Sequence, residues 1–326
     1  MTPFFSVLIP VYNQVGKMDK CIDSLNAQSF KEFEVIFVDD GSTDDSYEML
    51  KKYAKEDERF SVLRHEKNSS LVYARHTAMQ KATGEYIFIL DSDDYLENDA
   101  FAILHDFIME NRVDIVRFGC VAEPMKYEIM PKETEDLLGS FLEGKDESAI
   151  WKRCYSKDLI TKVLESFEPF YCNMGEDTFY TVLLYTYANS HKDLNQILYH
   201  YETEGMSSVS MPVSLEKMIK DYASINAVEE NVTAFMEKNN KEYLEAAQKQ
   251  IRFMKRFTLG RCLLNDADYK DVIEKINIID REKDAGIYDF CCNKVIPYKE
   301  KRAIYQSEKE LEGKRIPMFM EICREE

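Results

Sequence analysis

Apolar runs of strand length alternate with helix-like segments through the first third of the chain, and this alternation constrains the fold most strongly. The apolar runs cover residues 5–9, 33–38, 60–64, 86–90 and 114–118. The segments between them that repeat apolar residues at helical spacing cover residues 17–28, 44–55 and 72–82. Such alternation is typical of a mostly parallel sheet with crossover helices. We therefore predict an α/β, doubly wound sheet here.

The remainder of the chain is less regular and then becomes helical. Helices are expected at 133–142 and 177–187, followed by a strand at 196–201. Charge-rich helical segments follow at 214–239, 241–264 and 268–276. Because 326 residues exceed the length at which one hydrophobic core usually stops growing, we expect two domains, at 1–213 and 214–326.

Composition excludes some classes of partner and compartment. The chain has 42 basic and 60 acidic residues, and its net charge of -18 disfavours general attraction to nucleic acid. The N-terminus lacks the features of a secretory signal, and no stretch reaches 18 uninterrupted apolar residues. The 8 cysteines are scattered without a C-x-x-C pair, which indicates free thiols. We expect a cytoplasmic protein.

Two acids and a glycine follow the second apolar run, at Asp39, Asp40 and Gly41, with Ser42 next. In a doubly wound sheet, ligands bind outside the carboxyl ends of the strands. Carboxylates at such a place can accept hydrogen bonds from a ligand. Alternatively, these residues form a turn and cap the next helix, although capping accounts for Ser42 better than for the paired acids.

Three acids in four positions follow the fourth apolar run, at Asp91, Asp93 and Asp94, with Ser92 among them. Such a concentration of like charge is costly, and a divalent cation would relieve it. Mg²⁺ and Mn²⁺ prefer carboxylate oxygens and share their remaining sites with substrate phosphates. The alternative is an acidic N-terminus for a helix at 98–110.

Several segments together resemble the family 2 glycosyltransferases of the GT-A fold. Four of them occur in family order within residues 4–120, at 6–13, 38–44, 82–87 and 91–94. Downstream, the segment 151–155 is similar to the family's Trp-containing segment, and 175–177 resembles its Glu-Asp motif. The resemblance therefore reaches about residue 210.

This resemblance implies an inverting transferase that moves a sugar from a nucleotide-sugar donor, such as a UDP-sugar, to a hydroxyl group with Mn²⁺ or Mg²⁺. It implies that Asp177 is the general base, with Glu176 as the fallback, although from residues alone both acids could simply begin a helix. It assigns Asp93 to the metal, and Asp91 to the ribose or, through water, to the metal. The remaining donor-site residues would be Pro10, Tyr12 and Asp40 at the base, Asp39 supporting the turn, Arg75 near the base or diphosphate, and Ser92.

The first domain would then bind the donor and catalyse transfer, and the second would contact the acceptor, a membrane or a partner. The acceptor would be a glycan, a lipid-linked saccharide or a glycoprotein. The basic and apolar segment 249–261 fits either a peripheral membrane contact or an ordinary bundle helix. Homo-oligomer formation stays open.

Two positions depart from the family pattern. His76 stands where asparagine is usual, and Glu202 stands where arginine is frequent. These departures argue mildly for an alternative, a catalytically degenerate transferase that serves as a glycan-binding or partner subunit. Retention of Asp40, Asp91, Asp93 and Asp177 argues against it. A sugar-phosphate nucleotidyltransferase is disfavoured because no Gly-rich basic loop follows the first strand, and a dinucleotide-dependent oxidoreductase because G-x-G-x-x-G is absent.

Overall fold

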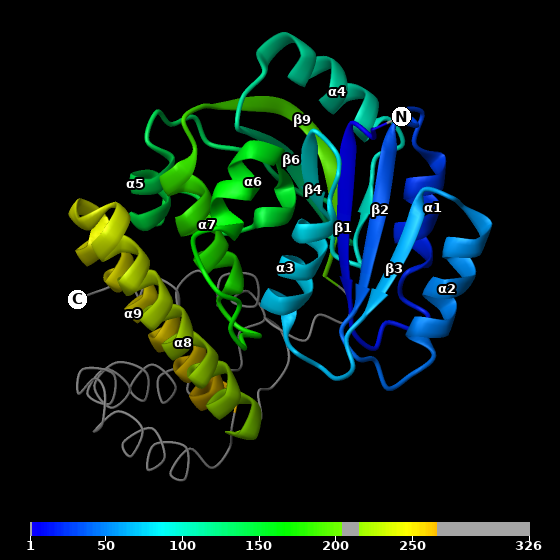
Figure 1. Cartoon of the computed structure of the whole chain (residues 1–326). Coiled ribbons are helices and arrows are strands. Elements are labelled where there is room, and N and C mark those ends of the chain that lie inside the picture. Colours follow the sequence, from blue (N-terminus) through cyan, green and yellow to red (C-terminus); the bar gives the residue numbers. More distant parts are fainter. Residues whose placement is uncertain (1, 204–214, 266–326) are drawn as a thin grey trace, which may run out of the picture.

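The computed structural model describes residues 2–203 and 215–265, and one sheet organises the first of these ranges (Figure 1). Its strands are β1 (Phe5–Val11), β2 (Phe33–Asp39), β3 (Phe60–Arg64), β4 (Tyr86–Ile89), β5 (Tyr95–Leu96), β6 (Ile115–Glu123), β7 (Tyr127–Ile129), β8 (Arg153–Ser156) and β9 (His191–Glu202). Their order is β3-β2-β1-β4-β8-β6-β9-β5, with β7 paired to β6.

Helices cover both faces of this sheet. They are α1 (Asp19–Ala27), α2 (Ser46–Glu56), α3 (Leu71–Lys81), α4 (Ala100–Asn111), α5 (Leu137–Leu142), α6 (Lys157–Leu164), α7 (Glu176–Tyr187), α8 (Leu215–Asn239) and α9 (Leu244–Asn265). Helices α3, α6 and α7 lie together on one face, and α1 lies on the opposite face (Figure 1).

The predicted α/β, mostly parallel sheet is confirmed. Strands β3, β2, β1 and β4 are adjacent and parallel, and β6 pairs with β9 in parallel. All seven residues of β1 are buried, as expected for a central strand that is covered on both faces. The carboxyl ends of β1, β2 and β4 consequently meet at one edge of the sheet.

The second half of the sheet differs from the prediction. Strand β8, which was not predicted, lies between β4 and β6 and is antiparallel to both. It has only four residues, which is too short for an alternating pattern to be recognised. The helix expected at 133–142 begins only at Leu137, because Asp136 caps it by accepting a hydrogen bond from Gly139 N at 2.8 Å.

Helices α8 and α9 confirm the predicted helical C-terminal region and pack against each other. Helix α8 also contacts α7, and α9 contacts α5, so the pair rests on the sheet domain (Figure 1). The helix expected at 268–276 lies outside the described residues. The division of the chain at residue 213 stays a prediction.

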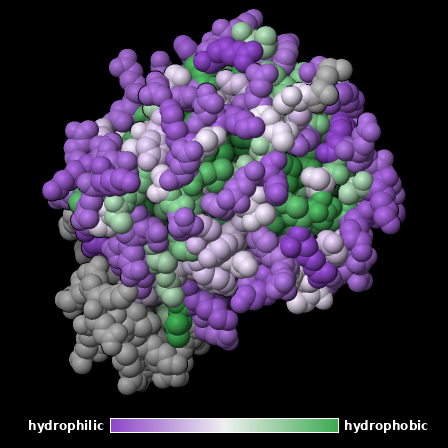
Figure 2. Space-filling model, in the orientation of Figure 1, coloured by the Kyte–Doolittle hydropathy of each residue, from purple (hydrophilic) through white to green (hydrophobic). Residues whose placement is uncertain are grey.

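The described surface shows no membrane-spanning element. Within residues 2–203 and 215–265, no helix is both long and apolar enough to cross a bilayer. Figure 2 shows a mainly hydrophilic face, with apolar residues visible in recesses between polar ones. Four cysteines of the described part are buried free thiols, as predicted, namely Cys21, Cys120, Cys154 and Cys172.

Candidate active site

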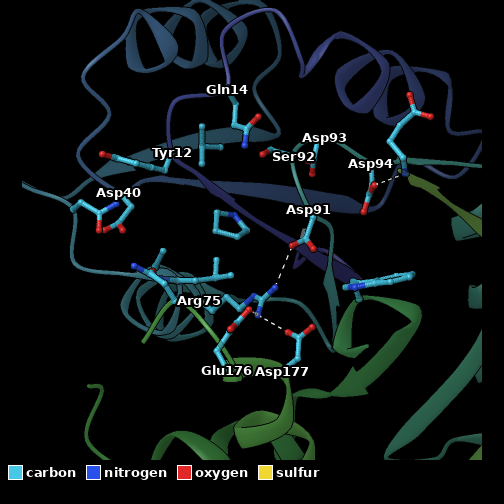
Figure 3. A pocket seen from close by; sticks show the side chains of 18 of the residues that line it. Tyr12, Gln14, Asp40, Arg75, Asp91, Ser92, Asp93, Asp94, Glu176 and Asp177 are labelled. Carbon is cyan, nitrogen blue, oxygen red and sulfur yellow. Dashed lines mark hydrogen bonds and ion pairs between the residues drawn. The ribbon is translucent and has the colours of Figure 1, made fainter. Parts of the chain in front are cut away.

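A pocket of about 560 Å³ opens where the carboxyl ends of β1, β2 and β4 meet α3 and α7. All the site residues predicted from the sequence line it except Asp39; they are Pro10, Tyr12, Asp40, Arg75, Asp91, Ser92, Asp93, Glu176 and Asp177 (Figure 3). Tyr12 is 42% exposed at the rim, where its ring is available for stacking. The fold thus brings acids from distant segments to one cavity.

Asp40 organises the loop that lies beside it. Its carboxylate accepts hydrogen bonds from Ser69 N at 2.9 Å and Ser70 N at 2.8 Å. His65 Nδ1 lies 2.7 Å from Asp40 Oδ1, and His65 Nε2 lies 3.0 Å from Thr77 Oγ1. Asp40 therefore already holds one wall of the pocket, which leaves it limited capacity to accept a further bond from a nucleobase.

His65 was not among the predicted site residues, although the sequence carries a signal for it. His65 directly follows β3, so it occupies the same kind of position as Asp40 after β2.

Asp39 and Gly41 build the turn beneath this loop. Asp39 is fully buried; its Oδ2 lies 3.1 Å from Arg64 Nε and accepts a hydrogen bond from Ser42 N at 3.3 Å. Gly41 has φ +70, and a Cβ there would lie 2.4 Å from the carbonyl carbon of Lys67. Only glycine allows this close approach. Asp39 thus contacts the turn rather than the cavity.

The acidic turn at 91–94 does not cap a helix. Strand β5 follows it directly, and α4 begins only at Ala100 with Asp99 at its N-cap. The capping alternative for these acids is therefore wrong. Within the turn, the acids face different surroundings and have different partners.

Asp94 also lines the pocket, but it is almost fully buried and anchors β9. Tyr199 Oη donates to Asp94 Oδ2 at 2.6 Å, and Glu202 N donates to Asp94 Oδ1 at 2.8 Å. Burial, with the nearby charge of Asp91, raises the pKa of Asp94 to about 9. Tyr199 Oη also accepts a hydrogen bond from Asp91 N at 3.2 Å, so one hydroxyl group holds the turn from two sides.

Asp91 and Asp93 both face the pocket, and Asp93 has the charge environment of a cation ligand. Burial and the neighbouring Asp91 raise the pKa of Asp93, because its ionised form is poorly compensated. No group of three or more ligating side chains occurs among the described residues. Mg²⁺ commonly takes only one or two protein carboxylates and completes its shell with phosphates and water. Asp91 and Asp93 fit that donor set.

Glu176 and Asp177 lie in the first turn of α7. The alternative that these acids begin a helix therefore describes their structure correctly. Gly175 precedes them at φ +90, a conformation that glycine adopts without strain. Burial, with Asp177 close by, raises the pKa of Glu176 to about 7. Burial also raises the pKa of Asp177, while Arg75 opposes the rise.

Arg75 lies between these acids and Asp91 rather than beside Asp40. Its Nη1 lies 2.7 Å from Asp177 Oδ1 and 3.6 Å from Glu176 Oε1, and its Nη2 lies 3.2 Å from Asp91 Oδ1. Figure 3 shows the guanidinium group pointing between Asp91 and Asp177. The sequence did not predict this contact.

An aromatic stack forms part of the wall near Asp94. Trp151 stacks on Tyr199 at 4.5 Å and on Tyr201 at 4.8 Å between ring centroids. Trp151 and Tyr201 also line the pocket. Tyr201 was not among the predicted site residues, although it lies near the carboxyl end of a predicted strand. The rings give the otherwise acidic cavity an apolar surface.

The two departures from the family pattern have different surroundings. His76 is buried against Phe167, with ring centroids 5.5 Å apart, and burial lowers its pKa; it is a packing residue. Glu202 lines the pocket, and its Oε2 lies 2.5 Å from Lys20 Nζ. Glu202 thus adds a further carboxylate, paired to a lysine, close to the acidic turn.

The segment 249–261 forms part of α9, and its side chains are described up to residue 258. Lys255 is buried and its Nζ lies 2.6 Å from Glu229 Oε2 on α8, while Ile251 is buried in the core. These contacts are those of a bundle helix. Peripheral membrane contact by this segment stays a prediction.

Comparison with known proteins agrees with the fold. The model of the glycosyl transferase family 2 matches residues 6–167. EpsH of Bacillus subtilis (strain 168), assigned as a glycosyltransferase, is 30% identical over 278 residues, which are 81% of this chain and 78% of EpsH. The chain therefore belongs to glycosyl transferase family 2.

Solved structures show the same GT-A architecture. TarS 1-349 of S. aureus, in complex with UDP-GlcNAc, matches with a TM-score of 0.56 at 21% identity, over 88% of this chain and 89% of that chain. The mannosyltransferase PcManGT of Pyrobaculum calidifontis, in complex with GDP-Man and Mn²⁺, matches with a TM-score of 0.56 at 13% identity, over 99% of this chain and 86% of that chain. At these identities the likeness concerns the fold.

Proposed function

We propose that this glycosyltransferase transfers a sugar, with inversion, from a UDP-sugar to a hydroxyl group of a glycan, lipid-linked or protein-linked acceptor. The observation that carries the proposal is the meeting of Asp91, Asp93 and Asp177 at one pocket, although they come from segments far apart in the chain. Asp91 and Asp93 would bind the cation at the donor's diphosphate, and Asp177 would take the proton from the acceptor hydroxyl group. The UDP-GlcNAc complex of TarS supports a uridine donor.

Asp91 and Asp93 are the residues that would hold Mn²⁺ or Mg²⁺. A bound divalent cation supplies neutralisation of the negative charge that develops on the leaving diphosphate. The raised pKa of Asp93 supports this assignment, since a cation would compensate the charge that burial and Asp91 disfavour. The Mn²⁺ complex of PcManGT supports the choice of metal.

Asp177 would act as the general base. As the acceptor oxygen bonds to the anomeric carbon and the bond from that carbon to the diphosphate breaks, the hydroxyl proton moves to the carboxylate of Asp177. Attack from the face opposite the leaving group inverts the anomeric centre. Arg75 lies nearer to Asp177, at 2.7 Å, than to Glu176, at 3.6 Å, and so favours ionised Asp177. This difference favours Asp177 over Glu176.

A donor screen tests the proposal. Release of UDP from a panel of UDP-sugars would be measured with Mn²⁺, with and without glycan acceptors, and then after chelation. We expect one donor to be turned over, the activity to be lost on chelation, and Mn²⁺ to restore it. Binding of UDP without any turnover would support the degenerate alternative, whereas neither binding nor turnover would contradict a uridine donor altogether.

Asp177→Asn tests the base separately. The amide is nearly isosteric but cannot take a proton, so transfer should fall by about two to four orders of magnitude while UDP still binds. Asp158→Asn is the matched control, because Asp158 is also an acid in the first turn of a helix but is exposed on α6. Transfer that survives Asp177→Asn at the wild-type rate would remove Asp177 as the base.

A further inference from the structure

Arg75 is a buried cation that bonds both Asp91 and Asp177 in the pocket. Its side chain is 1% exposed, although it contributes to the pocket lining. Nη1 donates to Asp177 Oδ1 at 2.7 Å, and Nη2 donates to Asp91 Oδ1 at 3.2 Å (Figure 3). Two separate nitrogens of one planar group are therefore bound to two separate carboxylates.

These carboxylates come from different elements of the fold. Asp91 follows β4, Asp177 lies in α7, and Arg75 lies in α3, which is 102 residues before Asp177 in the chain. The guanidinium group is rigid and presents its donors in a fixed fork, so it sets the separation of the two carboxylates it binds. Lysine has no such fork, because its ammonium is a single charge on a flexible stem.

The hydrogen bonds of Arg75 go to Asp177 and Asp91 and not to Asp40. Arg75 Nε is buried and has no hydrogen-bond partner among the residues that the structure describes. Asp40 is bonded instead to Ser69, Ser70 and His65. The charge of Arg75 is thus compensated by Asp177 and Asp91, at the end of the pocket away from the Asp40 loop.

We propose that Arg75 is a positioning residue that fixes the carboxylate of Asp177 relative to the donor-side carboxylate of Asp91. The inference rests on the proposed function, because it needs Asp177 as base. It differs from direct donor binding in its kinetic signature. Loss of positioning slows the chemical step and leaves donor affinity unchanged, whereas loss of a donor contact weakens donor binding.

Arg75→Lys tests this distinction because it keeps the positive charge and removes the fork. Misplacement of a catalytic group by about one ångström costs roughly a hundredfold in rate, so we expect kcat to fall by about ten- to a hundredfold. The dissociation constant of UDP with Mn²⁺, measured by titration calorimetry, should change by less than about threefold.

Arg117→Lys is the matched control. Arg117 is also buried and also bridges two acids, with Nε 2.7 Å from Asp193 Oδ1 and Nη1 3.2 Å from Asp146 Oδ2. It does not line the pocket. Its variant should lose stability in a similar way and keep both kcat and UDP affinity, which separates positioning from general loosening of the fold.

A second variant keeps the test decisive if Arg75→Lys folds poorly. In the Asp177→Asn background, Arg75→Lys should cause less than about a twofold further loss, because residues that act through one group are not additive. If Arg75→Lys alone does not fold, the transfer rate of the double variant is compared with that of Asp177→Asn alone. A rate that is a further tenfold lower in the double variant would overturn the inference.

Three other results would overturn it. They are an unchanged kcat in folded Arg75→Lys, a UDP dissociation constant raised about tenfold or more in that variant, and equal losses of kcat in Arg75→Lys and Arg117→Lys. An inactive wild type would overturn the proposed function together with this inference. An active wild type with any of the three results overturns the inference alone.

Discussion

Replacing Gly175 with alanine should destabilise the protein and slow transfer, because this glycine begins the turn that carries Glu176 and Asp177. Gly175 has φ +90, and an L-residue in the left-handed region costs about 1–2 kcal/mol. A Cβ there would also lie 2.5 Å from Met254 Cε on α9. Met254 Cε is the far end of a flexible side chain that can move aside, so this contact costs only about 1 kcal/mol, the low end of the range for overpacking. Together, the two effects amount to about 2–3 kcal/mol.

Gly16→Ala separates the two contributions. Gly16 has φ +75, but a Cβ there would meet nothing within 4 Å, so only the backbone cost of about 1–2 kcal/mol applies. The free energies of unfolding would be measured with urea for both variants. Met254→Ala, made in the wild type and in Gly175→Ala, should relieve the contact and show a coupling energy of about 1 kcal/mol.

Transfer kinetics complete the test. Any shift of the turn at Gly175 moves Asp177 from Arg75, so kcat should fall by roughly ten- to a hundredfold in Gly175→Ala, and Gly16→Ala should keep the wild-type value. Equal destabilisation by the two alanine variants, together with zero coupling to Met254, would refute the reasoning that α9 packs directly on this turn.

Tyr199→Phe should destabilise the fold by about 1–3 kcal/mol, because it removes the hydroxyl group that bonds buried Asp94 at 2.6 Å. Tyr86→Phe is the comparison, since the Tyr86 hydroxyl group bonds a backbone carbonyl away from the pocket. Urea unfolding should show a lower free energy of unfolding for both variants. Only Tyr199→Phe should also reduce transfer. A hydrogen bond from Arg59 lowers the pKa of Asp57 in the folded protein. The pair therefore stabilises the fold at any pH above the pKa of Asp57 in the unfolded chain, which is about 3.9. This stabilisation is lost as the pH falls through the lower pKa of the folded protein. The difference in unfolding free energy between wild type and Asp57→Asn should therefore shrink on acidification from neutral pH; a difference that grows would contradict the assigned sign.

The sheet could be predicted because its strands carry local signals. The run that became β1 is buried along its whole length, and such apolar runs bounded by turn residues need no knowledge of distant contacts. Strand β8 gave no such signal. Its four residues are held by pairing with β4 and β6, so its existence depends on the strands around it.

The sequence also did not show how neighbouring acids differ in their surroundings. Asp91, Asp93 and Asp94 occupy one short turn and all three line the cavity, yet Asp94 is almost fully buried and bonded to Tyr199. Asp39 and Asp40 are also neighbours, and of these two only Asp40 lines the pocket. Adjacent residues point in different directions, and a motif reports residue type without orientation.

The sequence by itself determined the parallel part of the sheet, the family and most of the acids that line the pocket, because strand patterns and short motifs are local properties of the chain. Only the tertiary structure decided how those acids are connected. Arg75 bonds Asp177 across 102 residues, through the packing of α3 and α7 on one face of the sheet. A contact between residues so far apart in the chain depends on how the helices and strands pack. It also depends on which acids lie close enough to compensate the buried cation, and no local sequence pattern shows either.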